Sequence, residues 1–197
     1  METRSIICPT NDAMAFLQAW MPEALVESSR FYCPSSMSDV PSMARDIIYR
    51  RQLQTLVIHD VHSTHPNVFD DQEDRVRAVL TLNASEEQFE VVIAAPTVFI
   101  MLFETQEIFG TVFGDRATEY LSLMGSYDPE RAIRESGTCA AEIIGNIDST
   151  MRERLRDTPT ARRILEGITT LDAKPFTYEN GGHFAEHRRP PQMRHWD

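Results

Sequence analysis

The hydrophobic and polar positions in the first half of the chain alternate between strand-like runs and helical stripes. Compact apolar runs bounded by turn residues predict four strands, at 4–8, 24–32, 54–62 and 88–95. Apolar residues at helical spacing predict the intervening helices, at 13–20, 38–51, 70–80 and 97–109. This alternation predicts the α/β class, with a mostly parallel central sheet of about four strands flanked by helices.

The second half of the chain changes pattern and predicts helices almost throughout. Ile143, Ile147 and Met151 recur at helical spacing, and little strand signal is found between 115 and 171. We therefore expect a helical C-terminal portion and three parts in all, namely an α/β core at 1–113, a helical extension packed on it at 114–172, and a polar tail at 173–197. The tail is expected to be mobile unless a partner holds it through its aromatic side chains.

Composition is typical of a soluble protein with one hydrophobic core. The 197 residues are 42% hydrophobic, which is enough for such a core. The apolar stretch "VVIAAPTVFIMLF" is shorter than the roughly 20 residues that cross a bilayer, and Pro96 interrupts it. The N-terminus shows no signal segment, and the three cysteines fit neither a disulfide framework nor a structural zinc site. We therefore expect a cytoplasmic protein with reduced thiols and no membrane-spanning segment.

The charge pattern opposes one class of partner. The formal net charge is −11, which repels nucleic-acid phosphates unless basic residues gather on one face. Of the 19 basic residues only Lys174 is lysine, and arginine suits bidentate contacts to phosphate or carboxylate. The paired and clustered arginines lie at 50–51, 152–156, 162–163 and 188–189. Each group is typical of a solvated helix face, so the net charge does not support nucleic acid as a partner.

Polar side chains gather where the first and third predicted strands end. Asp12 follows Cys8 in the loop that opens the first helix, while Asp60 and His62 end the third strand. Strand side chains alternate between faces, so Asp60 and His62 are expected on one face and His59 on the other. In an open parallel sheet, ligands bind beyond the carboxyl ends of the strands. We therefore expect four side chains to come together there, those of Cys8, Asp12, Asp60 and His62.

This order of elements resembles the Toprim fold, the metal-binding module of topoisomerases, primases and nucleases of the overcoming-lysogenization-defect type. In particular it resembles small stand-alone Toprim-like proteins, which often accompany ATPases in bacterial gene neighbourhoods. In that family the first strand ends in Glu-Gly-x-x-Asp, a middle strand ends in Asp-x-Asp, and a later strand leads to Pro-Glu-x-Glu. The corresponding stretches here are "CPTND" at 8–12, "DVH" at 60–62 and "PTVF" at 96–99. The resemblance extends over residues 5 to 170 and includes the closing helix "TPTARRILEGI".

The resemblance implies magnesium or manganese as the cofactor, but several of the family's carboxylates are replaced. Cys8 stands in place of the first glutamate, and His62 in place of the second aspartate. Thr97 and Phe99 replace the two glutamates of the later motif. Two acids are retained, Asp12 and Asp60. Because magnesium is held mainly by carboxylates and water, we expect these replacements to weaken its binding.

The substituted residues also suggest two other kinds of chemistry. Cys8, Asp60 and His62 are side chains that bind zinc, although zinc is less favoured here than magnesium or manganese because His59 faces away. Cys8 before a helix would also suit a nucleophile with His62 as its base. The simpler interpretation makes Cys8 a small buried residue at a strand end and the polar cluster structural.

Three functions follow from these patterns. The favoured one is a Toprim-like protein with a degenerate active site, acting as a binding or accessory subunit of a nucleic-acid-processing or phage-defence assembly with an ATPase as its protein partner. The alternative is a divalent-metal-dependent nuclease with a rearranged site built from Asp12, Asp60 and His62, with Asp70 or Glu104 as further candidates. The third is an acidic regulator or decoy that occupies a basic groove of another protein.

Two structural observations would separate the first two functions. Convergence of the four strand-end side chains around an open cleft would favour the nuclease. A buried Cys8 together with a Phe99 that fills the cleft would favour the binding subunit. The sequence carries no signal for the oligomeric state.

Overall fold

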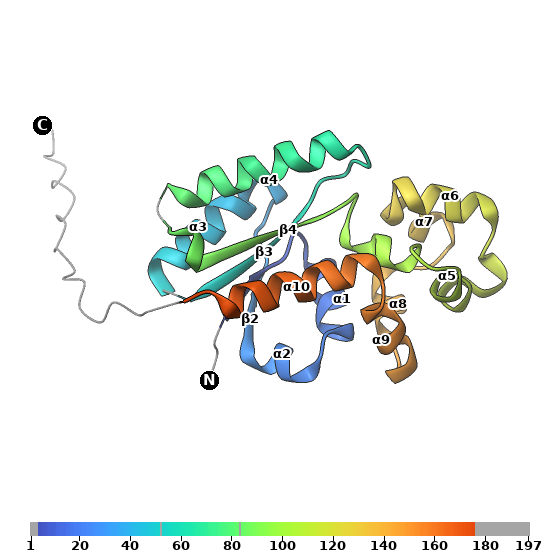
Figure 1. Cartoon of the computed structure of the whole chain (residues 1–197). Helices are drawn as coiled ribbons and strands as arrows, with labels where there is room; N and C mark the ends of the chain where they lie inside the picture. The colour runs from blue at the N-terminus through green and yellow to red at the C-terminus, as the bar shows by residue number, and fades with distance from the viewer. Residues whose placement is uncertain (1–3, 52, 83, 176–197) are drawn as a thin grey trace, which may run out of the picture.

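A four-stranded parallel sheet forms the centre of the protein. The computed structural model describes residues 4–51, 53–82 and 84–175, without the side chains of Met37 and Arg51. The strands are Arg4–Ile7 (β1), Ser29–Tyr32 (β2), Gln54–Asp60 (β3) and Phe89–Ala94 (β4). They lie in the order β2-β1-β3-β4, with every neighbouring pair parallel. The predicted α/β class, with helices flanking a parallel sheet, is therefore confirmed (Figure 1).

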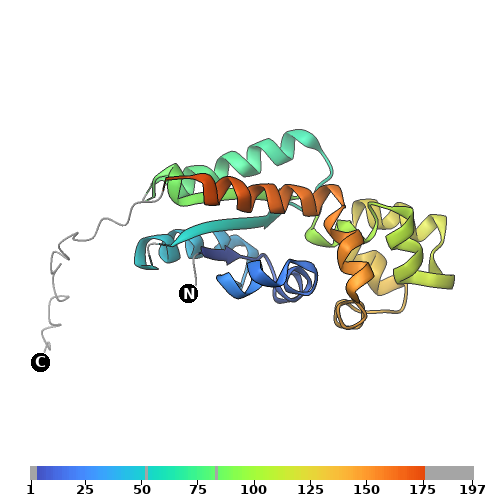
Figure 2. The same ribbon diagram turned by 60° about the horizontal axis from the view of Figure 1, so that its bottom comes forward.

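Helices cover both faces of this sheet (Figures 1 and 2). One face carries α1 (Asn11–Trp20) and α10 (Pro159–Ala173), and the other carries α3 (Val40–Arg51) and α4 (Pro66–Thr81). Two clusters of buried hydrophobic side chains correspond to the two faces, so that Ile6 belongs to one cluster and its neighbour Ile7 to the other. Burial on both faces explains why β3 and β4 read as continuous apolar runs.

Helix α10 lies directly on β4 because Gly167 has no side chain. A Cβ atom at Gly167 would lie 2.6 Å from Cγ2 of Val92 and 3.2 Å from Cδ1 of Leu56. Glycine therefore allows the helix backbone to approach the sheet closely. The predicted helical extension at 114–172 includes most of α10, which packs on the sheet; below, the name helical extension denotes α5 to α9 (residues 106–156).

The helical extension lies at the end of the sheet toward which β4 runs (Figures 1 and 2). Its helices are α5 (Gln106–Phe113), α6 (Glu119–Tyr127), α7 (Pro129–Glu135), α8 (Ala140–Gly145) and α9 (Ser149–Arg156). Several of them begin at a side chain that accepts a hydrogen bond from the first turn, namely Thr105, Thr118, Asp128 and Asp148. Their buried side chains join the same hydrophobic cluster as α1 and α10, which attaches the extension to the sheet.

Two segments differ from the pattern-based prediction. The segment 24–32, predicted as one strand, folds as α2 (Glu23–Ser28) followed by β2, because the carbonyl of Pro22 accepts hydrogen bonds from the backbone N–H groups of Leu25 and Val26. The segment 97–109, predicted as one helix, is divided into the 3-10 helix η3 (Val98–Leu102) and α5. The division falls where Thr105 caps the new helix.

The described chain ends just beyond α10, beside the start of β4. Nζ of Lys174 donates to the carbonyl oxygens of Glu86 at 2.8 Å and Phe89 at 2.6 Å, and it pairs with the carboxylate of Glu90 at 2.7 Å. From residue 176 on, the predicted polar tail lies outside the described residues. Within the described ranges, no helix has the length and apolar character needed to span a bilayer.

Candidate functional site

The carboxyl group of Asp60, the last residue of β3, is buried. The residue is 2% exposed, and its Oδ1 accepts a hydrogen bond from the backbone N–H of Val98 at 3.1 Å. Burial raises the pKa of this carboxyl group well above its usual range; the bond from Val98 opposes the rise, and the charge of Glu130 adds to it. Among the described residues, Oδ2 has no hydrogen-bond partner. This environment favours the protonated form of Asp60.

Asp60 holds together the two loops that follow β3 and β4. The backbone N–H of Val61 donates to the carbonyl oxygens of Ala94 at 3.2 Å and Pro96 at 3.1 Å, and His62 donates to Pro96 at 2.8 Å. The N–H of Val98 lies in the first turn of η3, where a helix cannot satisfy its own donors. By accepting that hydrogen bond, Asp60 serves as a cap for the segment that leaves β4.

Cys8, the residue after β1, is completely buried. Its backbone N–H donates to the carbonyl of Tyr32 at 2.8 Å, so the pairing of β1 with β2 continues and brings Cys33 beside it. Burial raises the pKa of the Cys8 thiol, and the charges of Cys33 and Asp60 raise it further. A thiol that keeps its proton is a weak nucleophile and a weak metal ligand.

We expect the three cysteines to react with iodoacetamide in the order of their exposure. Cys139 is exposed and should be alkylated first, Cys33 is partly exposed and should follow, and Cys8 should react only after unfolding. Mass spectrometry of the native protein checks this order, with the urea-unfolded chain as the control that labels all three. Rapid alkylation of Cys8 in the native protein would contradict its burial and restore the nucleophile interpretation.

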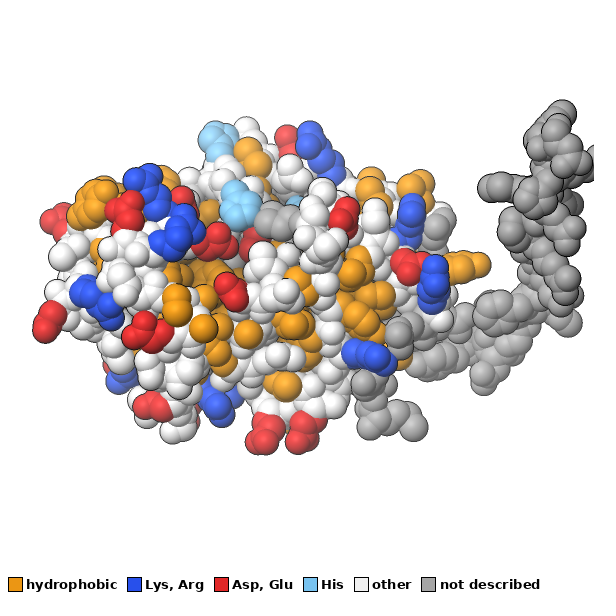
Figure 3. All heavy atoms as spheres, turned by 180° about the vertical axis from the view of Figure 1, so that it is seen from behind, with side chains coloured by type: hydrophobic (Ala, Val, Ile, Leu, Met, Phe, Trp, Pro, Cys, Tyr) orange, Lys and Arg blue, Asp and Glu red, His pale blue; other side chains and the backbone are white. Residues whose placement is uncertain are grey.

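Asp12 and His62 are exposed, unlike Asp60. Asp12 lies in the first turn of α1, where a negative charge interacts favourably with the helix dipole. The alternation that placed Asp60 and His62 on one face does not reach His62, because β3 ends at Asp60 and His62 has a positive φ of 52°. His62 instead acts on His59, whose pKa is lowered by burial and then by the charge of His62. Histidine side chains reach the surface on the face seen in Figure 3.

The two positions that carry glutamates in the Toprim pattern hold buried side chains here. Phe99 is 2% exposed and its ring lies 5.1 Å from that of Phe16, centroid to centroid. Thr97 is equally buried, and its hydroxyl accepts a hydrogen bond from the backbone N–H of Phe99 at 3.3 Å. Cys8 and Phe99 belong to one hydrophobic cluster beneath the strand ends.

The donor groups at the strand ends fit a magnesium ion poorly. Asp12 offers an exposed carboxylate, whereas Asp60 is buried in a setting that favours its protonated form. Of the two further candidates, Glu104 accepts hydrogen bonds from the backbone N–H and the hydroxyl of Thr160, and Asp70 lies exposed on α4. Within residues 4–51, 53–82 and 84–175, no three His, Cys, Asp or Glu side chains form a group that could hold a metal ion.

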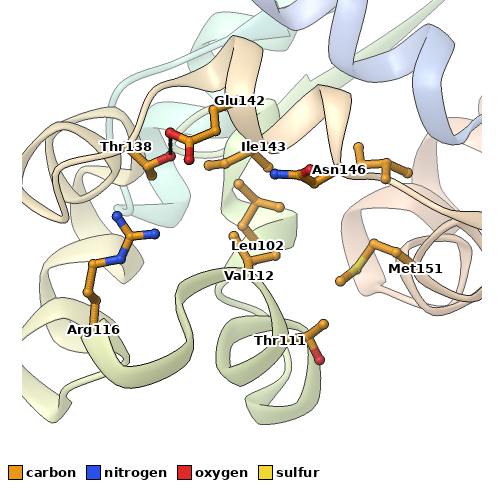
Figure 4. A pocket seen from close by; sticks show the side chains of 10 residues that line it. Leu102, Thr111, Val112, Arg116, Thr138, Glu142, Ile143, Asn146 and Met151 are labelled. Atoms are coloured by element: carbon orange, nitrogen blue, oxygen red, sulfur yellow. Dashed lines mark hydrogen bonds between the residues drawn. The ribbon is translucent and has the colours of Figure 1, made fainter.

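A cavity of about 230 Å³ lies in the helical extension (Figure 4). Its apolar lining includes Leu102, Val112 and Ile143, and Arg116 and Glu142 add charged groups. The guanidinium of Arg116 donates to the carbonyl of Ser136, and the hydroxyl of Thr138 donates to Glu142 at 2.7 Å. Pattern-based reasoning missed this cavity, because it is built from helices whose relative placement has no local signal.

Two electrostatic partners of the strand-end residues were also missed. Cys33 lies after β2 and acts on Cys8, a relation that correct placement of β2 would have suggested. Glu130 on α7 acts on Asp60, although the two residues are far apart in the sequence. Only the packing of α7 near η3 brings that second charge close.

The fold and the strand ends define a class of protein. The chain is an α/β protein with a four-stranded parallel sheet, and η3 and the helical extension follow β4 at the end of the sheet toward which that strand runs (Figures 1 and 2). Comparisons of the chain with protein-family models, curated proteins and solved structures give no match. The function is therefore argued from the geometry of its surfaces.

Proposed function

We propose that this chain is a Toprim-like protein with a degenerate site, acting as a binding or accessory subunit of a nucleic-acid-processing or phage-defence assembly with an ATPase as its partner. The observation that carries the proposal is the buried carboxyl group of Asp60, which is 2% exposed and bonded to the N–H of Val98. A catalytic or metal-binding acid has to be reached by substrate or metal. Asp60 instead stabilises the loop after β4.

Exposed apolar side chains on α6 support a protein partner. Tyr120, Leu123 and Tyr127 are 65%, 61% and 63% exposed. Their spacing of three and four residues places them in one stripe along the helix. Large apolar side chains gathered on one surface are typical of sites that bind other proteins.

Calorimetric titration of the full chain with magnesium and manganese chloride tests the proposal. We expect no binding at micromolar concentrations, because the strand-end carboxylates fit these ions poorly. DNA and RNA should remain intact with magnesium, manganese or zinc, both with the chain alone and in the presence of candidate ATPases. Micromolar binding of either ion that is lost in Asp60→Asn, or cleavage lost in the same variant, would overturn the proposal.

One observation favours the alternative, a divalent-metal-dependent nuclease with a rearranged site. Oδ2 of Asp60 is buried without a hydrogen-bond partner among the described residues, and such an atom is a candidate ligand. In that case Asp12→Asn and Asp60→Asn should each reduce cleavage by at least about tenfold, since each removes a charged oxygen ligand. Glu153→Gln on α9, which is exposed and belongs to none of the strand-end motifs, is the matched control.

A further inference from the structure

One edge of β4 is open. The strand pairs with β3 on one side and with no other strand of the described chain on the other side. Along a strand, successive residues direct their peptide groups to opposite sides. The carbonyl of Ala94 accepts a hydrogen bond on the β3 side, and that of Phe89 accepts one from Lys174 on the open side. Val91 and Ile93 therefore direct their peptide groups to the open side.

Charged side chains cover the first part of this edge. Lys174 binds the carbonyl of Phe89, and the carboxylate of Glu90 accepts from the N–H of Val91 at 3.3 Å while it pairs with Arg77. Covering an edge with charges is a common protection against the addition of further strands. The second part lacks this protection, and three peptide groups have no hydrogen-bond partner within the described ranges, the C=O of Val91 and the N–H and C=O of Ile93.

A groove of about 370 Å³ follows the uncovered part of the edge. It lies between α4 and α10 with β4 at its floor, and its lining includes Phe69, Asp70, Val91, Ile93, Glu166 and Gly167. The missing side chain of Gly167 keeps α10 close to the strand. A groove with a strand edge at its floor suits an extended peptide, whose backbone can continue the sheet.

The walls of the groove carry acidic side chains. Glu73 and Glu90 are paired with Arg77, whereas Asp70 on α4 and Glu166 on α10 take part in no ion pair of the described chain. Arg163, a basic residue of the lining, donates to the hydroxyl of Thr160. Together with the net charge of −11, these carboxylates attract a basic ligand.

We infer that this groove binds an extended, basic segment of a partner protein, which adds to the sheet as a strand beside β4. The segment exchanges backbone hydrogen bonds with Val91 and Ile93, its lysine or arginine side chains meet Asp70 and Glu166, and an apolar side chain faces Phe69. This assignment rests on the proposed binding function and gives that function a surface and a kind of partner.

A basic partner fits this groove better than a second copy of the chain. A second copy also carries a charge of −11 and would bring its own acidic wall against Asp70. The chain's own C-terminal segment fits less well for a topological reason. If this segment added a strand parallel to β4, the connection from β4 to it would run through α10, on the face of the sheet that carries α1. The connections through α3 and α4 cross on the other face, so the new connection would have the opposite, disfavoured hand.

The test uses a capped peptide of alternating lysine pairs and valine pairs, whose neighbouring lysines point to opposite faces of the sheet, titrated into the full chain at low salt while amide hydrogen exchange is followed. Exchange of the Ile93 amide should slow by at least about tenfold on binding, whereas the Val92 amide, which already faces β3, should change little. The same peptide with N-methyl groups on alternate residues keeps its charge but loses edge donors, and it should not bind. A glutamate and valine peptide should not bind either.

Two double charge-reversal variants distinguish binding of the peptide in the groove from a general attraction between the acidic chain and a basic peptide. Asp70→Arg with Glu166→Arg changes both walls, and Asp74→Arg with Glu153→Arg makes the same charge change at exposed positions outside the groove. The groove variant should bind the peptide at least about tenfold more weakly, and the control less than about twofold. Equal weakening in both variants, or binding of the methylated peptide, would overturn the inference.

Protection of the Ile93 amide without any peptide would also overturn it, because the edge would then have another occupant. Protection that rises with protein concentration would identify a second copy, and protection independent of concentration would identify the chain's own C-terminal segment. Metal-dependent cleavage of nucleic acid would refute the proposed function without changing the peptide result. These experiments therefore distinguish failure of the inferred peptide binding from failure of the proposed function.

Discussion

Replacing Gly125 with alanine should lower the free energy of unfolding by about 3 kcal/mol, because the new methyl group enters a filled aromatic cluster. A Cβ atom at Gly125 on α6 would lie 2.0 Å, 2.1 Å and 2.5 Å from three ring atoms of Phe103. That ring packs against Phe109 and Phe113, with centroids 5.7 Å and 5.2 Å away, so it has little room to move. Alanine is otherwise the better helix former by about 1 kcal/mol, so the overlap has to exceed that gain.

Gly110→Ala is the matched control for this substitution. Gly110 lies within α5, and a Cβ atom there would meet nothing within 4 Å. The control should therefore stabilise the protein, by up to about 1 kcal/mol. Urea unfolding followed by circular dichroism measures both variants. Equal stability of the two variants would show that Phe103 does not pack against α6 as the structure has it.

Replacing Asp60 with asparagine should make the protein more stable at neutral pH and remove part of the dependence of its stability on pH. In the folded chain the pKa of Asp60 lies well above the usual range of an aspartate, mainly through burial. Between the unfolded and the folded pKa, the folded state binds more protons than the unfolded state. The contribution of Asp60 to stability is therefore complete below the unfolded pKa and is lost as pH rises through the folded pKa, with a slope of at most about 1.4 kcal/mol per pH unit.

Asparagine keeps the oxygen that accepts from Val98 but carries no charge, so the variant should gain over the natural chain as the pH rises from about 4 to 8. Urea unfolding of both proteins across this range measures the difference. Asp60→Ala serves as the control, because it lacks both the charge and the bond to Val98 and should be less stable than Asp60→Asn by about 1 kcal/mol at every pH. A natural chain that gains stability over Asp60→Asn with rising pH would mean that Asp60 is ionised and held by a cation, which favours the nuclease.

The strongest pattern-based predictions concern segments whose burial is uniform. The runs at 54–62 and 88–95 are apolar along their length because both faces of β3 and β4 are covered, and such runs identify central parallel strands. The segment 24–32 was predicted wrongly at its start. Its Leu25 and Val26 carry strand-forming character, but α2 forms there, with both side chains packed against the larger cluster.

For the candidate site as well, the sequence pattern predicted some properties correctly and left others undetermined. Its place at the ends of β1 and β3 follows from element order, and the retained and replaced acids can be read from the motifs. Whether each of these side chains is buried or exposed does not follow from the motifs. Asp60 is buried at the end of β3, where it accepts a hydrogen bond from Val98, whereas Asp12 is exposed in the first turn of α1.

The sequence by itself determined the α/β class, the parallel sheet and the helical second half, because these depend on periodicity among neighbouring residues. Only the tertiary structure decided which acids reach the solvent, how closely α10 approaches β4 at Gly167, and which part of the β4 edge stays open. Each of these depends on residues far apart in the chain, such as Val92 with Gly167 or Asp60 with Glu130. Their distances are set by the packing of whole elements, for which no local pattern exists.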